Sequence, residues 1–170
     1  MAQIGLFYGS TDGTTREVAR RVQRAFGGPG EVAIYAVEDA TAADLARHTR
    51  LILATSTWDE GHLQEDWADF LDVLDATPLH DKAIALIGTG DASGYPATFL
   101  DGMGILYEKI AGKVWLLVGQ WPAAGYRFAA SRALRRGHFV GLALDEVNQP
   151  ERTDARIAAW VKQVQEEWGL

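Results

Sequence analysis

The chain has 170 residues, of which 48% are hydrophobic, a size and composition typical of one domain with one substantial core. It contains no cysteine, which excludes disulfides, cysteine-ligated iron–sulfur clusters and thiol nucleophiles, so any redox role must depend on a bound organic cofactor. The net charge of -7 argues against nucleic acid or an anionic membrane as a partner and favours a basic protein surface. We therefore expect a single domain over residues 1–170.

Signals for membranes, secretion and metals are weak throughout the chain. No apolar run approaches the roughly 18 residues that span a bilayer, and residues 1–15 contain no Lys or Arg of the kind that begins a signal peptide. The histidines are too scattered for a metal site; they are His48, His62, His80 and His138. We expect a cytoplasmic protein that binds neither a membrane nor a metal.

Short apolar runs rich in β-branched residues recur along the chain and predict buried strands. They span residues 4–8, 31–37, 50–55, 82–88 and 113–119. Apolar residues with helical spacing follow four of these runs, and segment 41–47 has a weaker helical pattern. These four apolar stripes begin at Val18, Trp67, Phe99 and Ile157.

Strands that alternate with helices indicate a parallel sheet covered on both faces, because parallel strands need crossovers and the crossover helices bury the sheet. The predicted fold class is therefore α/β, a three-layer, doubly wound, five-stranded parallel sheet. Residues 120–138 are aromatic and basic, and a strand-like run follows them at residues 139–144. We predict that this long loop interrupts the fifth strand.

The loop after the first strand is rich in small and hydroxyl residues. It contains Gly9 and residues 10–15, and Thr14 with Glu17 forms a capping-box pattern that predicts a helix start. Small residues allow the backbone to wrap closely around an anion, and the N–H groups of the first helical turn point towards it. The loop predicts a phosphate site; the alternative is an ordinary strand-to-helix turn.

The loops after the third and fourth strands each carry one aromatic residue among polar ones. Trp58 lies within residues 54–63, and Tyr95 lies in the glycine-rich segment 88–96. A flat side chain in such a loop can cover one face of an aromatic ligand, although an isolated loop tryptophan more commonly folds into the core. Two aromatics and a phosphate loop at one end of a sheet favour a planar phosphorylated cofactor.

These loops resemble those of the flavodoxins. Residues 10–15 resemble the family's phosphate loop, 57–61 its inner flavin loop and 88–95 its outer one, while 102–110 and 137–149 are similar to the long-chain subclass. The resemblance implies a flavodoxin-like fold that binds FMN at the switch point of strand order. Open parallel sheets generally bind their ligands at this point, and flavodoxin is one of the known examples of that rule. It implies that the flavin is bound by Ser10, Thr11, Asp12, Gly13, Thr14, Thr15, Ser56, Thr57, Trp58, Asp59, Glu60, Gly61, Thr89, Gly90, Asp91, Tyr95 and Thr98.

The resemblance also implies how these residues act. The FMN phosphate would lie in the first loop, the isoalloxazine would lie between Trp58 and Tyr95, and the peptide joining Asp59 to Glu60 would rotate on reduction. Asp12 departs from the family pattern, which usually has Thr at that position, and a carboxylate facing a phosphate would repel it by roughly 1 kcal/mol or more.

The implied function is that of a monomeric, low-potential one-electron carrier, not an enzyme. It would shuttle between a basic flavoprotein reductase, such as ferredoxin/flavodoxin-NADP reductase, and an acceptor redox enzyme. The alternatives are an FMN-dependent NAD(P)H/quinone reductase, a flavodoxin-like interaction module without FMN and, more remotely, a phosphoacceptor receiver domain.

Charge is unevenly distributed along the chain, which bears on the predicted partners. Residues 51–80 contain seven acidic residues and no Lys or Arg, whereas residues 120–138 contain four Arg and no acidic residue. The acidic segment predicts a rim beside the flavin, with an ordinary solvated helix face as the alternative. Polarity of this kind orients transient encounters between redox partners.

Overall fold

The structure, a computed structural model, describes residues 2–170 and is built around one mostly parallel sheet. The strand order along this sheet is β10-β5-β3-β1-β2, with β6 beside β5 and the antiparallel β4 beside β3. A small second sheet has the order β7-β9-β8. The strands are β1 (Ile4–Tyr8), β2 (Val32–Ala36), β3 (Arg50–Trp58), β4 (His62–Leu63), β5 (Ala83–Thr89), β6 (Leu116–Val118), β7 (Trp121–Pro122), β8 (Leu134–Arg135), β9 (His138–Phe139) and β10 (Leu142–Leu144).

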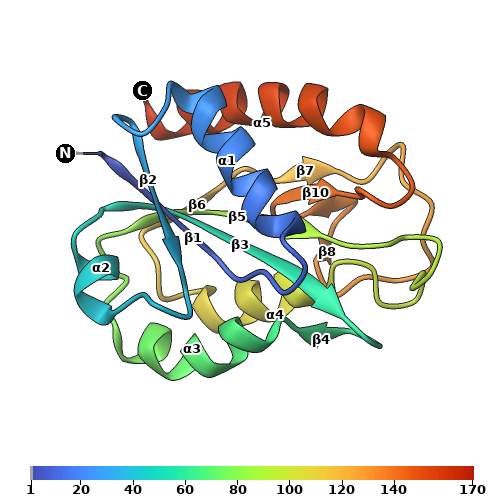
Figure 1. Cartoon of the computed structure of the whole chain (residues 1–170), viewed down its shortest axis with the longest axis horizontal. Helices are drawn as coiled ribbons and strands as arrows, with labels where there is room; N and C mark the ends of the chain where they lie inside the picture. Colours follow the sequence, from blue (N-terminus) through green and yellow to red (C-terminus); the bar gives the residue numbers. More distant parts are fainter. Residues whose placement is uncertain (1) are drawn as a thin grey trace.

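Helices cover both faces of the main sheet, so the predicted three-layer α/β fold is confirmed (Figure 1). Helices α1 and α5 lie against one face, and α3 and α4 lie against the other. None of the helices within residues 2–170 is both long and apolar enough to cross a membrane. The helices are α1 (Thr14–Phe26), α2 (Ala42–Ala46), α3 (Glu65–Ala76), α4 (Asp101–Ile110), the short 3-10 helix η1 (Pro150–Arg152) and α5 (Thr153–Trp168).

The central strands are apolar on both faces, which is why they form near-continuous hydrophobic runs. In β3, Leu51 and Leu53 pack into the core beneath α3 and α4, whereas Ile52 and Ala54 pack into the core beneath α1 and α5. All four side chains are fully buried. The alternation of side chains along a strand therefore divides one continuous apolar run between two cores.

Two short strands pair with the outer edge of β5, one along its first half and the other along its second half. Strand β6 pairs in parallel with residues 83–85, and β10 pairs in parallel with residues 87–89. The chain between them, residues 119–141, contains the small three-stranded sheet. Run 139–144 was predicted as one strand, and this was wrong: Phe139 belongs to the small sheet, and the chain crosses to the main sheet at Gly141, where a side chain would collide with the Leu86 carbonyl.

The strand order places a switch point beside β1, because β2 lies on one side of it and β3 on the other. In open parallel sheets, ligands bind beyond the carboxyl ends of the strands at such a point. The loops that follow β1, β3 and β5 therefore meet at one edge of the sheet, as the sequence predicts.

Candidate functional site

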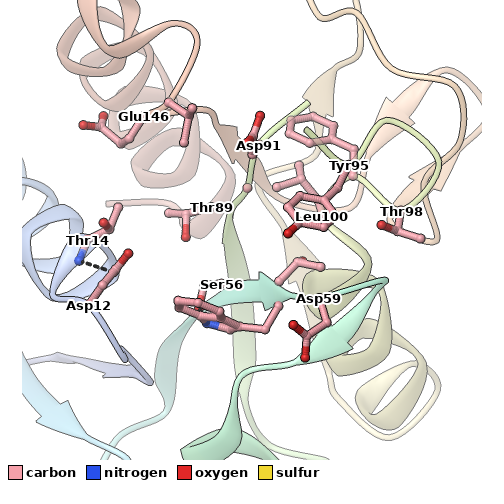
Figure 2. Close-up of a pocket in the computed structure, with 15 residues that line it drawn as sticks. Asp12, Thr14, Ser56, Asp59, Thr89, Asp91, Tyr95, Thr98, Leu100 and Glu146 are labelled. Atoms are coloured by element: carbon pink, nitrogen blue, oxygen red, sulfur yellow. Dashed lines mark hydrogen bonds between the residues drawn. The ribbon is translucent and has the colours of Figure 1, made fainter. Parts of the chain in front are cut away.

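A cavity of about 360 Å³ opens at this edge of the sheet, a volume within the range of small-molecule sites. In Figure 2, Asp12 and Thr14 lie at one end of it, Tyr95, Thr98 and Asp59 lie at the other, and Thr89 lies between them. Eleven of the predicted site residues line the cavity: Asp12, Thr14, Ser56, Thr57, Trp58, Asp59, Thr89, Gly90, Asp91, Tyr95 and Thr98.

Six predicted residues lie in the same loops without lining the cavity, namely Ser10, Thr11, Gly13, Thr15, Glu60 and Gly61. Four lining residues were not predicted, namely Phe99, Leu100, Glu146 and Val147. Phe99 and Leu100 precede α4, and their apolar side chains indicated only that they belong to the hydrophobic core. Glu146 and Val147 follow β10, about 130 residues after the first loop, and no local motif connects the two segments.

The loop between β1 and α1 is shaped by a glycine. Gly13 adopts φ 91°, a conformation that favours glycine, and its N–H donates to Ser10 Oγ at 3.1 Å. Helix α1 begins directly after it, so the predicted capping box of Thr14 with Glu17 was wrong: the N-cap residue is Gly13, which has no side chain to cap with. Instead, Asp12 Oδ1 accepts the Thr14 N–H at 3.0 Å.

Several backbone donors of this loop lack a protein acceptor. Within residues 2–170, no hydrogen bond to a protein acceptor is formed by the N–H groups of Ser10, Thr11, Asp12, Thr15 and Arg16. Such donors at a helix N-terminus form a ready site for an anion. The loop therefore offers free backbone donors of the kind that can bind a phosphate group.

A pair of threonines connects the start of α1 to the carboxyl end of β5. Thr15 Oγ1 and Thr89 Oγ1 lie 3.2 Å apart, and both side chains are buried. Only one of the two hydroxyls can donate in this contact, so the other keeps its proton for another acceptor. The pair thus fixes α1 to the end of β5 and offers one further donor beside the cavity.

The loop between β3 and β4 is a tight turn held by its flanking pairs. Trp58 pairs with His62 across it, and the Trp58 indole Nε1 donates to Ser56 Oγ at 2.8 Å. Asp59 has φ 47°, an uncommon conformation for a residue other than glycine, and Gly61 has φ 90°. The turn therefore already holds backbone strain next to the peptide that joins Asp59 to Glu60.

The loop after β5 is braced by Asp91. Its Oδ1 accepts the Gly94 N–H and the Asn148 Nδ2 amide, both at 2.8 Å. These hydrogen bonds, the one from Gly94 first, lower the pKa of the Asp91 carboxyl, which is therefore ionised at neutral pH. Tyr95 lies in the same loop and is 46% exposed, so part of its ring is free of protein contacts and can cover a ligand.

The acidic residues of α3 and the basic segment 120–138 differ in how many ion pairs they form. Within residues 2–170, the acidic residues of α3 make no ion pairs apart from Asp75, which lies within 4 Å of Lys109 and Lys113. In the basic segment, Arg132 and Arg135 pair with Glu108 on α4. Within residues 2–170, no group of three or more His, Asp or Glu residues could hold a metal ion.

Comparison with known proteins yields consistent matches along the chain. The family model described as flavodoxin matches residues 6–160. A flavodoxin of Synechococcus elongatus is 45% identical and one of Picosynechococcus is 46% identical, each covering 100% of both chains. The crystal structure of Fusobacterium nucleatum flavodoxin bound to flavin mononucleotide superposes with a TM-score of 0.91 at 28% identity, covering 98% of this chain and 99% of that one.

Proposed function

The chain belongs to the flavodoxin family of electron-transfer proteins, and from this premise we propose that it binds FMN without a covalent bond and carries single electrons. The observation that carries the proposal is the cavity at the switch point of the sheet, with unpaired amides at one end and two aromatic residues near the other. The FMN-bound Fusobacterium relative supports the choice of cofactor.

The first loop fits the phosphate end of FMN. The N–H groups of Ser10, Thr11 and Thr15 have no protein acceptor within residues 2–170. One of the two hydroxyls of Thr15 and Thr89 donates to the other, and the second hydroxyl proton remains free for a ligand. A dianion at this position would also interact favourably with the positive end of the α1 dipole. The Asp12 carboxylate works against it, because it already caps the Thr14 N–H from within the loop.

The other end of the cavity fits a flat, largely apolar ring. Leu100 is fully buried there, and its backbone adopts φ 60°, an unusual conformation that the close packing of Gly88 and Gly90 against its side chain helps to hold. Trp58 and Tyr95 would lie against the two faces of the ring. Such a slot excludes water from the ring and lowers the local dielectric.

The residues around this slot determine the reduction potential. FMN supplies the ability to accept electrons one at a time, and the chain controls how costly each added charge is. Asp59 and Asp91 line the cavity with negative charge, Glu60 lies next to Asp59 in the same turn, and burying a further anion beside like charges is unfavourable. We expect a strongly negative potential for the second electron.

We also propose that the electron donor is a basic flavoprotein reductase, of the ferredoxin/flavodoxin-NADP reductase type, and that an acceptor redox enzyme takes the electron on. Helix α3 follows the turn that contains Asp59 and strand β4 in the chain, and its acidic residues would attract a positive surface. The carrier would act as a monomer in the cytoplasm.

One experiment tests the proposal against its alternatives. The purified protein should show flavin absorbance with one FMN per chain, released on denaturation, and should accept electrons from NADPH only when a reductase is added. NADPH oxidation by the protein alone would indicate a reductase instead. Absence of flavin, even after incubation with excess FMN, would indicate an interaction module.

A further inference from the structure

A second cavity, of about 530 Å³, shares a wall with the flavin cavity. Its lining comes from the loop after β5, from the long segment between β6 and β10, and from the segment between β10 and α5, which meet at the right-hand edge of Figure 1. We call it the arginine cavity and define it by five of its lining residues: Ser93, Tyr126, Arg127, Asn148 and Arg152.

Positive charge converges on the arginine cavity. Arg127 makes no ion pair within residues 2–170, and Arg152 has only its neighbour Glu151, at 3.9 Å. Behind the wall, the Arg156 guanidinium lies 4.1 Å from the centre of the Tyr126 ring, and its Nη2 donates to Gln149 at 2.8 Å. In a chain with a net charge of -7, two arginines thus line one hollow, and a third, Arg156, contacts two of its other lining residues.

The innermost of these arginines retains an unused donor. Arg156 is only 9% exposed, and its Nη1 is buried without a hydrogen-bond partner in the part of the chain that the structure describes. An unpaired charged donor is costly to bury. An anion in the cavity would reduce the electrostatic part of that cost, because Arg156 contacts the lining residues Tyr126 and Gln149.

The acidic residues near the cavity are already engaged. Asp145 lines it, but its carboxylate accepts hydrogen bonds from the N–H groups of Ala92, Val147 and Asn148 and from the Asn148 side chain. Asp91 is held in the same way by Gly94 and Asn148. Within residues 2–170 neither carboxylate pairs with an arginine, so the guanidinium N–H groups of Arg127 and Arg152 are not engaged by them and remain available to a ligand.

We propose that the arginine cavity binds a phosphate group, carried by inorganic phosphate or by a small phosphorylated molecule, at a site separate from the 10–15 loop. Guanidinium groups bind phosphate oxygens through paired, charge-assisted hydrogen bonds, and Arg127 and Arg152 reach the cavity from two different segments. The Ser93 hydroxyl and the Asn148 side chain add polar groups. The volume also leaves room for the organic part of a small phosphate ester.

The segment 145–148 separates the two cavities, because it contributes lining residues to both. Glu146 and Val147 line the flavin cavity, whereas Asp145 and Asn148 line the arginine cavity. The Asn148 amide bridges the wall, since it donates to both Asp91 and Asp145. The proposal does not depend on the flavin, but Asn148 is a natural reporter for a ligand on the arginine side.

The test is a titration of the flavin-loaded protein with inorganic phosphate at constant ionic strength, followed by amide chemical shifts. We expect saturable shifts at Ser93, Gly125 and Asn148. Arg127→Gln and Arg152→Gln should each weaken binding about tenfold, the scale of one charge-assisted contact. Arg20→Gln is the matched control: it removes the same charge from an exposed position that lines neither cavity, and it should change the affinity less than about twofold.

A parallel titration with adenosine monophosphate distinguishes the two sources of the phosphate group. Tighter binding of the nucleotide would favour a phosphate ester, and equal or weaker binding would favour the free ion. The proposal is overturned if neither probe gives saturable shifts, if the shifts are confined to residues 10–15, or if Arg20→Gln weakens binding as much as the cavity variants. Flavin absorbance of the same samples reports FMN loading separately, so failure of one proposal does not obscure the other.

Discussion

The hydroxyl oxygens of Thr15 and Thr89 lie 3.2 Å apart, although the two residues are separated by 74 positions in the chain. Thr15 is in the first turn of α1 and Thr89 is the last residue of β5, and their exposures are 1% and 3%. This single contact connects the expected phosphate end of the cavity to the carboxyl end of β5. It therefore couples the stability of the fold to the shape of the site.

Replacement of either threonine by valine should leave the other hydroxyl buried without a partner. We expect Thr15→Val and Thr89→Val each to lower the free energy of unfolding by about 1 to 3 kcal/mol. The double variant should cost less than the sum of the two, since no orphaned hydroxyl remains. Urea unfolding of the apoprotein measures this; strictly additive losses would show that the two hydroxyls do not interact.

The fold could be predicted from the sequence because its signals are local. Apolar runs and helical stripes each depend on neighbouring residues, and β1 matches its predicted span of residues 4–8. The start of α1 was misjudged because Thr14 and Glu17 fit a capping pattern, whereas the backbone conformation of Gly13 decides where the helix begins. A pattern of residue types does not reveal which residue adopts the positive φ.

The candidate site was predictable only where a motif lies in one loop. The wall formed by Glu146 and Val147 depends on β10 reaching β5 after an excursion through residues 119–141. The arginine cavity was missed for the same reason: Arg127 and Arg152 meet only because two long connections fold against the loop after β5. Contacts of this range follow from topology, not from spacing.

The contribution of Trp58 to flavin binding can be measured against another tryptophan. Trp58→Ala should weaken FMN binding by about 1 to 3 kcal/mol, from lost aromatic contact and lost apolar area. Trp115→Ala is the control, because Trp115 is 71% exposed and lines neither cavity. Fluorescence titration of the apoproteins with FMN gives both affinities. An unchanged affinity for Trp58→Ala would make this residue structural.

Asp69 offers the cleanest test of the acidic docking surface. Glu65 and Asp66 lie in the first turn of α3, where their charge also stabilises the helix, whereas Asp69 lies one turn further on. Asp69→Lys should slow electron transfer from a basic reductase at low salt and reduce the salt dependence of the rate, with the flavin spectrum unchanged. Glu166→Lys, an exposed charge reversal on α5, should have little effect. Equal stopped-flow rates for both variants would place docking elsewhere.

His48 predicts a pH dependence of stability. Its side chain is 2% exposed, and its Nε2 lies 2.8 Å from the Tyr35 hydroxyl. Burial, followed by the charge of Arg47, lowers the pKa of His48 from the usual value of 6.5. The unfolded chain then binds more protons than the folded one just below pH 6.5, so stability should fall as pH decreases through this window.

We expect His48→Gln to flatten that slope, which is at most about 1.4 kcal/mol per pH unit for one proton. His138→Gln is the control, because His138 is exposed, and it should keep the slope of the parent protein. Urea unfolding at a series of pH values gives the slopes. If the parent protein and His48→Gln lose stability in parallel below pH 6.5, His48 does not cause the dependence.

We expect Asp12 to influence how well the first loop accepts a phosphate. Its carboxylate accepts the Thr14 N–H at 3.0 Å and lines the cavity, so it lies inside the loop rather than away from it. A phosphate dianion would have to tolerate this charge at close range. Asp12→Thr keeps an oxygen that can accept from Thr14, removes the negative charge and adds a hydroxyl donor.

We therefore expect Asp12→Thr to tighten FMN binding, by roughly 1 kcal/mol or more at low salt and by less at high salt, where the repulsion is screened. Riboflavin is the matched control, because it has the same ring without the phosphate, and its affinity should hardly change. Titration of the apoprotein with both ligands measures the difference. If both affinities rise equally, the substitution acts on the loop as a whole; if neither rises, the Asp12 carboxylate does not oppose the phosphate, and the backbone N–H groups of the loop determine its affinity.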